Sequence, residues 1–72
     1  MTQKQMVINY IDDFGSITQL QALADLGIMR LASRISDLKE DGFKIVKTME
    51  KTKNRYGKTV RYARYRKENT NV

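Results

Sequence analysis

Basic side chains are the groups in this sequence whose type and spacing could do chemistry. The chain has 14 Lys and Arg against eight Asp and Glu among its 72 residues, for a formal net charge of +6. Arg30 and Arg34 are four residues apart and would lie on neighbouring turns of one helix edge. An arginine can contact the paired acceptors of guanine in a DNA major groove, with about 1–3 kcal/mol of discrimination for each good bidentate pair. These two arginines are therefore candidates for contacts with nucleic acid, although an ion pair with Asp37 or Asp41 is the alternative for Arg34.

Catalytic and metal chemistry has little support in the composition. The sequence contains no histidine and no cysteine, which removes imidazole bases, thiolate nucleophiles, disulfides and the commonest metal ligands. Asp12 and Asp13 are adjacent, and adjacent residues on a helix do not face each other, so they do not make a catalytic pair. Instead we expect them to pair with cations of the second half of the chain or to stay solvated. We expect no enzymatic activity and no cofactor.

The basic residues are concentrated in the second half of the chain. Residues 1–42 hold four basic and six acidic side chains, whereas residues 43–67 hold ten basic and one acidic. Ten cations so close together repel one another, and phosphates that neutralise them release condensed counterions. The distribution indicates a surface for a polyanion; a solvated basic hairpin without a partner is the alternative.

Three stretches have the spacing of amphipathic helices. They cover about residues 3–14, 19–26 and 29–41. The last two are joined by a tight break at Gly27 and so predict a helix-turn-helix. The residues expected to face the core are Met6, Val7, Tyr10, Ile11 and Phe14 in the first helix, Leu20, Leu23, Ala24 and Leu26 in the second, and Leu31, Ile35 and Leu38 in the third.

The helix ends carry recognisable signals, with one exception. Thr2 with Gln5 and Thr18 with Gln21 match capping boxes that would open the first two helices. The third helix ends before Gly42, a residue type favoured just past a helix. Its start has Ile28-Met29 where a Ser or Thr cap is usual, so its amide groups are either satisfied by a neighbouring side chain or free to bind a phosphate.

After the third helix the pattern becomes extended. Residues 43–52 and 59–66 are rich in β-branched and aromatic side chains and predict two strands, joined by a turn at 53–58 that contains Asn and Gly. Alternation does not decide which face of 59–66 is buried, and Ile17 could form a short β-bridge. The expected fold class is mostly α with a β-hairpin (α+β): three helices followed by a two-stranded wing.

This order resembles a winged helix-turn-helix domain. The strings GSITQLQALADLGIMRLASRISDLKEDGFKI and KNRYGKTVRYARYR are similar to the small single-domain proteins of this type found in bacteriophages and other mobile elements. The resemblance covers about residues 3–66. It implies sequence-specific binding to double-stranded DNA, with helix 29–41 in the major groove and the wing tip 53–58 on the backbone or in the minor groove. On this basis residues 1–67 form the domain and 68–72 a flexible C-terminal tail.

The resemblance and helix-turn-helix geometry together define a set of expected contacts, because the first helix of the pair crosses the DNA backbone. The helices contribute Thr18, Gln19, Met29, Arg30, Ser33 and Arg34. The wing tip contributes Lys53, Asn54, Arg55, Tyr56 and Lys58.

The implied role is that of a phage or mobile-element transcriptional regulator or an excision-type architectural protein. No apolar run approaches the ~20 residues of a membrane span, and MTQKQM lacks the features of a secretory signal. We therefore expect a protein of the bacterial host cytoplasm, associated with the nucleoid, with no membrane partner. The expected partner is double-stranded DNA, bound by a monomer or a homodimer. Two alternatives stay open: a protein-binding inhibitor or adaptor that docks a host or phage protein through the winged-helix surface, and an RNA-binding module that stacks bases on Tyr56, Tyr62 and Tyr65.

Overall fold

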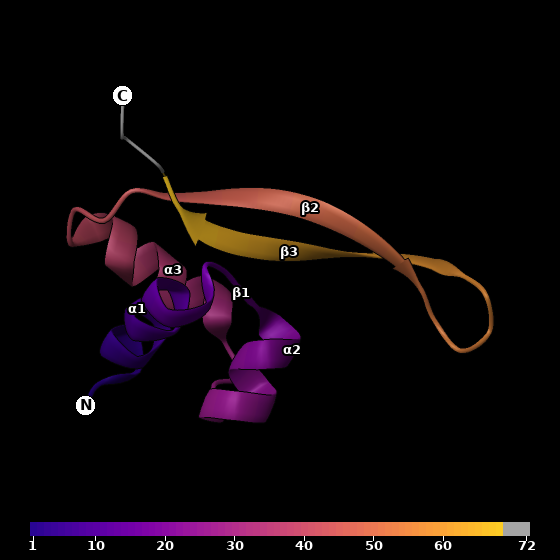
Figure 1. Ribbon diagram of the computed structural model, residues 1–72, viewed down its shortest axis with the longest axis horizontal. Helices are drawn as coiled ribbons and strands as arrows, with labels where there is room; N and C mark the ends of the chain where they lie inside the picture. Colours follow the sequence, from indigo (N-terminus) through magenta and orange to yellow (C-terminus); the bar gives the residue numbers. More distant parts are fainter. Residues whose placement is uncertain (69–72) are drawn as a thin grey trace.

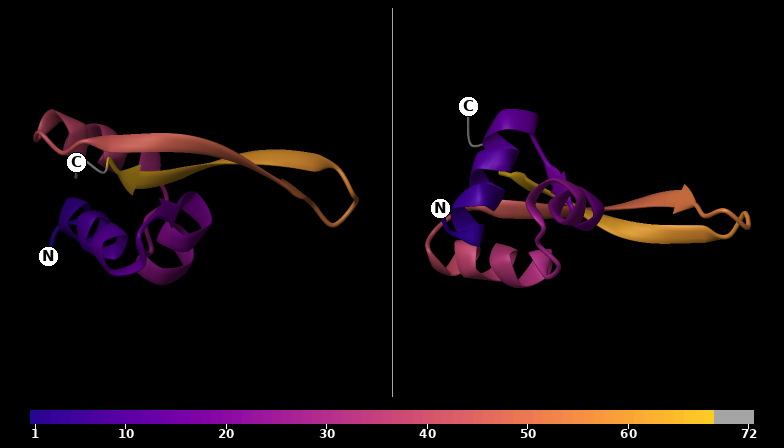
Figure 2. Two further views of the ribbon diagram at one scale, coloured as in Figure 1. Left: turned by 45° about the horizontal axis from the view of Figure 1, so that its top comes forward. Right: turned by 90° about the horizontal axis from the view of Figure 1, so that it is seen from below.

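The computed structural model describes residues 1–68; residues 69–72 lie outside the described part. In chain order the elements are α1 (Gln3–Phe14), β1 (Ile17–Thr18), α2 (Gln19–Gln21), the π-helical turn η1 (Ala22–Leu26), α3 (Leu31–Glu40), β2 (Ile45–Lys53) and β3 (Thr59–Lys67). The helices cluster beneath one end of the β2–β3 hairpin (Figure 1), whose other end extends well beyond them in every view (Figure 2). Of the predicted tail, Glu68 alone falls within the described residues, so the tail stays a prediction.

Helix α1 begins and ends where the sequence predicts. Thr2 Oγ1 accepts a hydrogen bond from the N–H of Gln5, and Gln5 Oε1 accepts one from the N–H of Thr2, which makes the reciprocal capping box. Gly15 ends the helix with a φ of 89°, in the left-handed region that glycine adopts without strain. The local signals at both ends were therefore sufficient to define this element.

The inward face of α1 is narrower than its spacing predicts. Val7 and Ile11 are buried, and Tyr10 packs partly against the core. Phe14 is wrong as a core residue because it is 71% exposed. It occupies the last position of α1, and its ring lies against that of Tyr10 at a centroid distance of 4.7 Å. The ring of Phe14 thus packs against Tyr10 at the surface and does not enter the core.

The predicted helix 19–26 is a single α-helical turn, α2, followed by the π-helical turn η1. A π-helix closes i→i+5 hydrogen bonds, which shifts the residues after it around the helix axis relative to an α-helical wheel. The predicted buried side is consequently wrong: Ala22 fills the core position, Leu23 is 47% exposed and Ala24 is exposed. Leu20, in the turn before η1, is 75% exposed. Leu26 is half-buried and packs against the core.

Helix α3 begins two residues later and ends one residue earlier than predicted, and its buried stripe is confirmed. Leu31, Ile35 and Leu38 are each at most 3% exposed. Gly42, with a φ of 100°, follows the helix. The N–H groups of Gly42 and Phe43 donate back to carbonyls of the last turn, as in a Schellman motif.

The sheet has three strands, whereas the sequence predicts a two-stranded wing. The strand order is β1-β3-β2, and β1 pairs antiparallel with β3 so that Ile17 lies opposite Tyr65. Ile17 is fully buried among the helices, and burial of its side chain brings the backbone of this short segment alongside β3. The added strand ties the helical cluster to the base of the hairpin, while the outer part of the hairpin remains two-stranded.

The core lies between the helices and the base of the sheet. Ile28, which the sequence assigns to the break between two helices, belongs to it with 1% exposure. The hairpin contributes little beyond its base: Ile45 is buried and Tyr65 partly so. The nine buried apolar residues are Val7, Ile11, Ile17, Ala22, Ile28, Leu31, Ile35, Leu38 and Ile45. Among the described residues no helix has the length and apolar character required to cross a bilayer.

Candidate nucleic-acid interface

A polar hollow lies at the start of α3, where the turn from η1 meets the first residues of α1. Gly27, with a φ of 69°, makes this turn. The hollow is lined by Gln3, Gly27, Met29, Arg30, Ser33 and Arg34. Four of these were expected to contact DNA, so the tertiary structure brings together the α3 part of the predicted site.

Arg30 is the freest charged group in this hollow. It is the N-cap residue of α3, it is exposed, and its side chain makes no capping hydrogen bond. No carboxylate of the described residues pairs with it. Met29 beside it is 77% exposed. The guanidinium of Arg30 is therefore available to an external acceptor without breaking any contact.

Arg34 is held within the molecule, and the alternative of an ion pair with Asp37 is confirmed. Arg34 Nε lies 3.2 Å from Asp37 Oδ2, which makes an ion pair, but the Nε–H group does not form a hydrogen bond with this carboxylate. Arg34 Nη1 donates to Gln3 Oε1 at 3.3 Å. Both Arg34 and Ser33 are half-buried. Arg34 would have to exchange these partners before its side chain could contact DNA.

Thr18 and Gln19, expected at the DNA backbone, use their side chains inside the protein. Thr18 is buried, and its hydroxyl accepts a hydrogen bond from the N–H of Gln21 at 3.2 Å. Gln19 Nε2 donates to the carbonyl oxygen of Ile28 at 2.8 Å, and Gln19 Oε1 accepts from the N–H of Leu31 at 2.9 Å. The first amide of α3, that of Leu31, is thus satisfied by a neighbouring side chain, one of the two options that the sequence leaves open.

The turn of the hairpin carries exposed cations, and side-chain hydrogen bonds fix its backbone conformation. Asn54 Oδ1 accepts hydrogen bonds from the N–H groups of Tyr56 at 2.9 Å and Lys58 at 3.0 Å. Asn54 therefore fixes the turn. Lys53, Arg55 and Lys58 are exposed, and Tyr56 is 86% exposed. Of the three hairpin tyrosines considered for base stacking, Tyr56 has an open ring, whereas Tyr62 and Tyr65 are half-buried in the sheet.

The strand register places further cations on one face of the hairpin. Lys51 lies opposite Arg61, and Lys47 and Lys53 follow β2 at positions that share their face, because side chains alternate between the faces of a strand. The other face carries the paired Glu50 and Arg64, and beyond them the uncharged side chains of Thr52, Val60 and Tyr62. This second face borders a hollow shared with α2, since Thr52 and Tyr62 line it together with Leu20.

Several residues of this candidate interface were not predicted from the sequence. Lys47, Lys51 and Arg61 are exposed on the cationic face of the hairpin. A signal for them was present, because lysines at 47, 51 and 53 keep the alternation of one strand face. On α3 the exposed side also includes Ser36, a small side chain that allows close approach of a partner.

Two cations at the base of the hairpin, Arg64 and Lys67, have carboxylate partners. Arg64 Nε lies 2.9 Å from Glu50 Oε1, and Arg64 Nη1 donates to Ser16 Oγ at 3.0 Å. The hydrogen bond from Arg64 lowers the pKa of the Glu50 carboxyl below its usual value. Lys67 Nζ lies 2.6 Å from Asp12, which confirms that Asp12 pairs with a cation of the second half. Arg64 and Lys67 are therefore engaged within the protein, unlike the cations of the outer hairpin.

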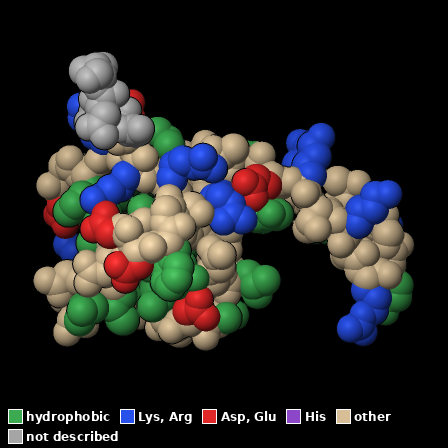
Figure 3. Space-filling view, viewed as in Figure 1, with side chains coloured by type: hydrophobic (Ala, Val, Ile, Leu, Met, Phe, Trp, Pro, Cys, Tyr) green, Lys and Arg blue, Asp and Glu red, His purple; other side chains and the backbone are tan. Residues whose placement is uncertain are grey.

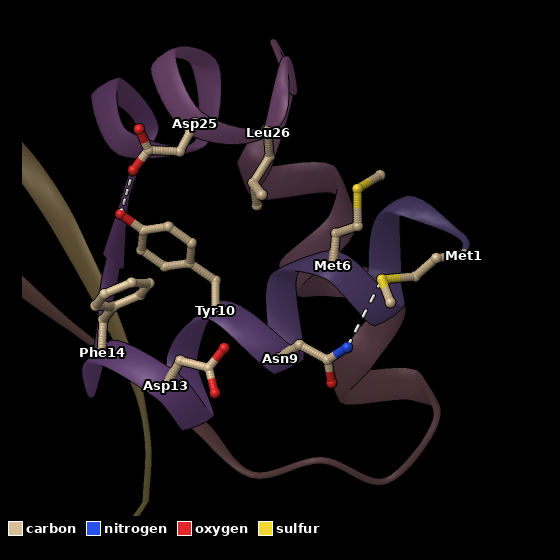
Figure 4. A pocket seen from close by; sticks show the side chains of 8 residues that line it. All are labelled: Met1, Met6, Asn9, Tyr10, Asp13, Phe14, Asp25 and Leu26. Atoms are coloured by element: carbon tan, nitrogen blue, oxygen red, sulfur yellow. Dashed lines mark hydrogen bonds between the residues drawn. The ribbon is translucent and has the colours of Figure 1, made fainter.

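A second hollow, between α1 and η1, has a different character (Figure 4). Tyr10 points across it, and its hydroxyl donates to Asp25 Oδ2 at 2.5 Å, which raises the pKa of the Tyr10 hydroxyl. Asp13 also lines it, with the apolar side chains of Met6 and Phe14 among others, and no Lys or Arg does. The negative charges of Asp13 and Asp25 would repel a phosphate, and no Lys or Arg side chain lines this hollow to attract one. The hollow is therefore not part of the candidate nucleic-acid interface.

Comparison with known proteins agrees with this geometry. A family model described as a winged helix-turn-helix domain matches residues 2–67, which includes every helix and strand described above. No curated protein and no solved structure matches the chain. The match covers nearly all of the sequence and supports DNA binding as the general activity. The chain belongs to the winged helix-turn-helix domain family.

Proposed function

We propose that this protein binds double-stranded DNA in a sequence-specific manner and acts as a transcriptional regulator or an excision-type architectural protein of a phage or mobile element. In this proposal α3 lies in the major groove and the hairpin lies on the backbone or in the minor groove. The protein acts by occupying or bending DNA and carries out no catalysis. A homodimer would place two copies on half-sites about one helical turn apart.

The observation that carries the proposal is the segregation of unpaired cations. Every acidic side chain that forms an ion pair within the described residues does so in the helical cluster or at the base of the hairpin. The outer hairpin holds no acidic residue, and its five Lys and Arg side chains at 51, 53, 55, 58 and 61 have no carboxylate partner there. Figure 3 shows Lys and Arg spaced along the projecting hairpin. The protein does not neutralise these charges of the outer hairpin, whereas a DNA backbone supplies one phosphate charge per about 1.7 Å of helix axis.

The two parts of the interface support different contributions to binding. Helix α3 carries Arg34 and Lys39 against Asp37 and Glu40, so it has no net charge and cannot supply general attraction. Its exposed Arg30 can supply base recognition. The hairpin, in contrast, supplies phosphate contacts that do not depend on sequence. We therefore assign affinity mainly to the hairpin and selectivity mainly to the start of α3.

The test compares the unaltered protein with Arg30→Ala. Duplexes bound from a random pool are sequenced, and anisotropy titrations then measure binding to the recovered duplex and to a random duplex. Because Arg30 makes no capping bond and no ion pair within residues 1–68, its removal should leave the fold intact. We expect Arg30→Ala to lower affinity for the recovered duplex by about 10- to 100-fold, as for one bidentate base contact, and to leave random-duplex binding within about twofold.

Arg66→Ala is the matched control, since Arg66 is exposed at the base of the hairpin and does not line the hollow at the start of α3. It should preserve the preference for the recovered duplex. Failure to recover any sequence would refute sequence-specific binding. A protein that binds no duplex at all, or binds with little salt dependence, would favour the protein-docking alternative, because phosphate contacts weaken steeply with salt.

A further inference from the structure

The side chain of Gln19 connects the first helix of the helix-turn-helix to the start of the second. It is the first residue of α2, and it reaches the turn with both ends of its amide. Gln19 Nε2 donates to the carbonyl oxygen of Ile28 at 2.8 Å, and Gln19 Oε1 accepts from the N–H of Leu31 at 2.9 Å. One side-chain amide therefore forms hydrogen bonds with the backbone at two positions that are three residues apart.

The two points lie on either side of the exposed residues Met29 and Arg30. Ile28 and Leu31 are buried, with exposures of 1% and 0%, so their side chains anchor the segment in the core. The N–H of Ile28 donates to the carbonyl oxygen of Ala22, and Gln19 supplies the partner for its carbonyl. The backbone that carries Arg30 is thus fixed before and after that residue, by apolar burial and by the Gln19 amide together.

Helix α3 has no side-chain cap of its own at its start. Its N-cap residue is Arg30, with a φ of −122° and a ψ of 66° and without a side-chain capping bond. A Ser, Thr, Asp or Asn at that position would normally accept from an early amide of the helix. Gln19 takes this role from a different helix, so it ties the start of α3 to α2 as well as satisfying the amide of Leu31.

We propose that Gln19 is a positioning residue for DNA recognition, which holds the Met29–Arg30 segment in the conformation that presents Arg30 to a base pair. This inference rests on the proposed function. Gln19 acts through the backbone of α3, and its own amide contacts neither base nor phosphate. Specific binding needs a group held close to its productive geometry, and a segment that must be ordered during binding loses affinity through that ordering. Phosphate contacts of the hairpin do not depend on this segment.

The experiment measures a ratio of affinities, because a general loss of folded protein lowers both affinities and cancels. Gln19→Ala removes both hydrogen bonds, and Gln19→Glu retains the acceptor for Leu31 but lacks the donor for Ile28. Gln5→Ala is the matched control: Gln5 makes the equivalent side-chain bond to the backbone of Thr2, at 3.0 Å, outside the helix-turn-helix. We expect both Gln19 variants to lower the ratio of recovered-duplex to random-duplex affinity at least tenfold, and Gln5→Ala to change it less than twofold.

A second measurement uses the protein without DNA. Amide hydrogen exchange of Leu31 should accelerate at least tenfold in Gln19→Ala, while the amides of Ile35 and Leu38 keep their protection. Unchanged exchange at Leu31, or an unchanged affinity ratio in Gln19→Ala, would overturn the positioning role and leave the proposed function intact. If the unaltered protein has no preference between duplexes, the proposed function fails and the positioning role fails with it.

Discussion

Neutralising the tip of the hairpin should change how binding depends on salt. Lys53, Arg55 and Lys58 are exposed and have no carboxylate partner among the described residues. The triple variant Lys53→Gln/Arg55→Gln/Lys58→Gln should therefore fold normally, since exposed substitutions of this kind change stability by about 0.5 kcal/mol or less. Asn54, which shapes the turn through its bonds to the N–H groups of Tyr56 and Lys58, is retained.

The size of the effect follows from counterion release. Each phosphate contact contributes about −0.9 to the slope of log K against log salt for duplex DNA, so loss of three contacts should flatten the slope by about 2.7. The affinities of the two proteins would converge near 1 M salt and differ by about 500-fold at 0.1 M salt. These are upper values, reached if each of the three cations neutralises one phosphate.

Anisotropy titrations with a random duplex at several salt concentrations measure both slopes. The control is Lys4→Gln/Lys44→Gln/Lys67→Gln, which removes the same number of positive charges from α1 and from the base of the hairpin. Lys4 and Lys67 already pair with Asp41 and Asp12, at 2.7 and 2.6 Å. We expect the control to flatten the slope by less than 1. Equal slopes for the two triple variants would mean that net charge alone sets the affinity, and the assignment of phosphate contacts to the hairpin tip would be refuted.

Two further predictions concern stability. Leu31→Ala should lower the free energy of unfolding by about 2–5 kcal/mol, because it leaves a cavity at a fully buried core position. Leu20→Ala, at a position 75% exposed, should change this free energy by about 0.5 kcal/mol or less. Urea unfolding measures both values, and similar losses would contradict the exposed placement of Leu20. Because Arg64 lowers the pKa of Glu50 in the folded protein, Glu50 contributes stability above the ordinary carboxyl pKa of 4.5, and this contribution is lost as the pH falls through the lower, folded-state value. Thermal melts should therefore show a smaller loss of stability below pH 4.5 for Glu50→Gln than for the unaltered protein, and parallel curves would rule out the Arg64 pair as a source of acid sensitivity.

Local sequence signals predicted the elements whose ends are defined by nearby residues. The capping box at Thr2 and Gln5 and the glycine at position 15 gave α1 its observed limits. The spacing of Leu31, Ile35 and Leu38 gave the buried stripe of α3. These signals act over a few residues, so no distant contact was needed to interpret them. The turn of the hairpin was predicted for the same reason.

Contacts between distant segments decided what the sequence left open or misassigned. The π-helical turn η1 changed which residues of 19–26 are buried, because one i→i+5 turn rotates the following residues relative to an α-helical wheel. No residue type in the segment predicts such a turn. The third strand required Ile17 to be buried beside Tyr65, 48 positions along the chain. The ion pair of Arg34 with Asp37 was one of two local options, and Gln3 of α1 joined it only through packing of the two helices.

The sequence alone determined the charge of this protein and its separation along the chain, because side-chain charge is a property of composition and order. It also determined the apolar spacing that makes α1 and α3 amphipathic. Tertiary structure decided which cations are free, since the choice between an internal carboxylate and solvent depends on distances across the fold. Within residues 1–68 it left Arg30 and the cations of the outer hairpin without a carboxylate partner, and it held Arg34 and Arg64 in internal contacts. It also assigned the amide of Gln19 to the start of α3.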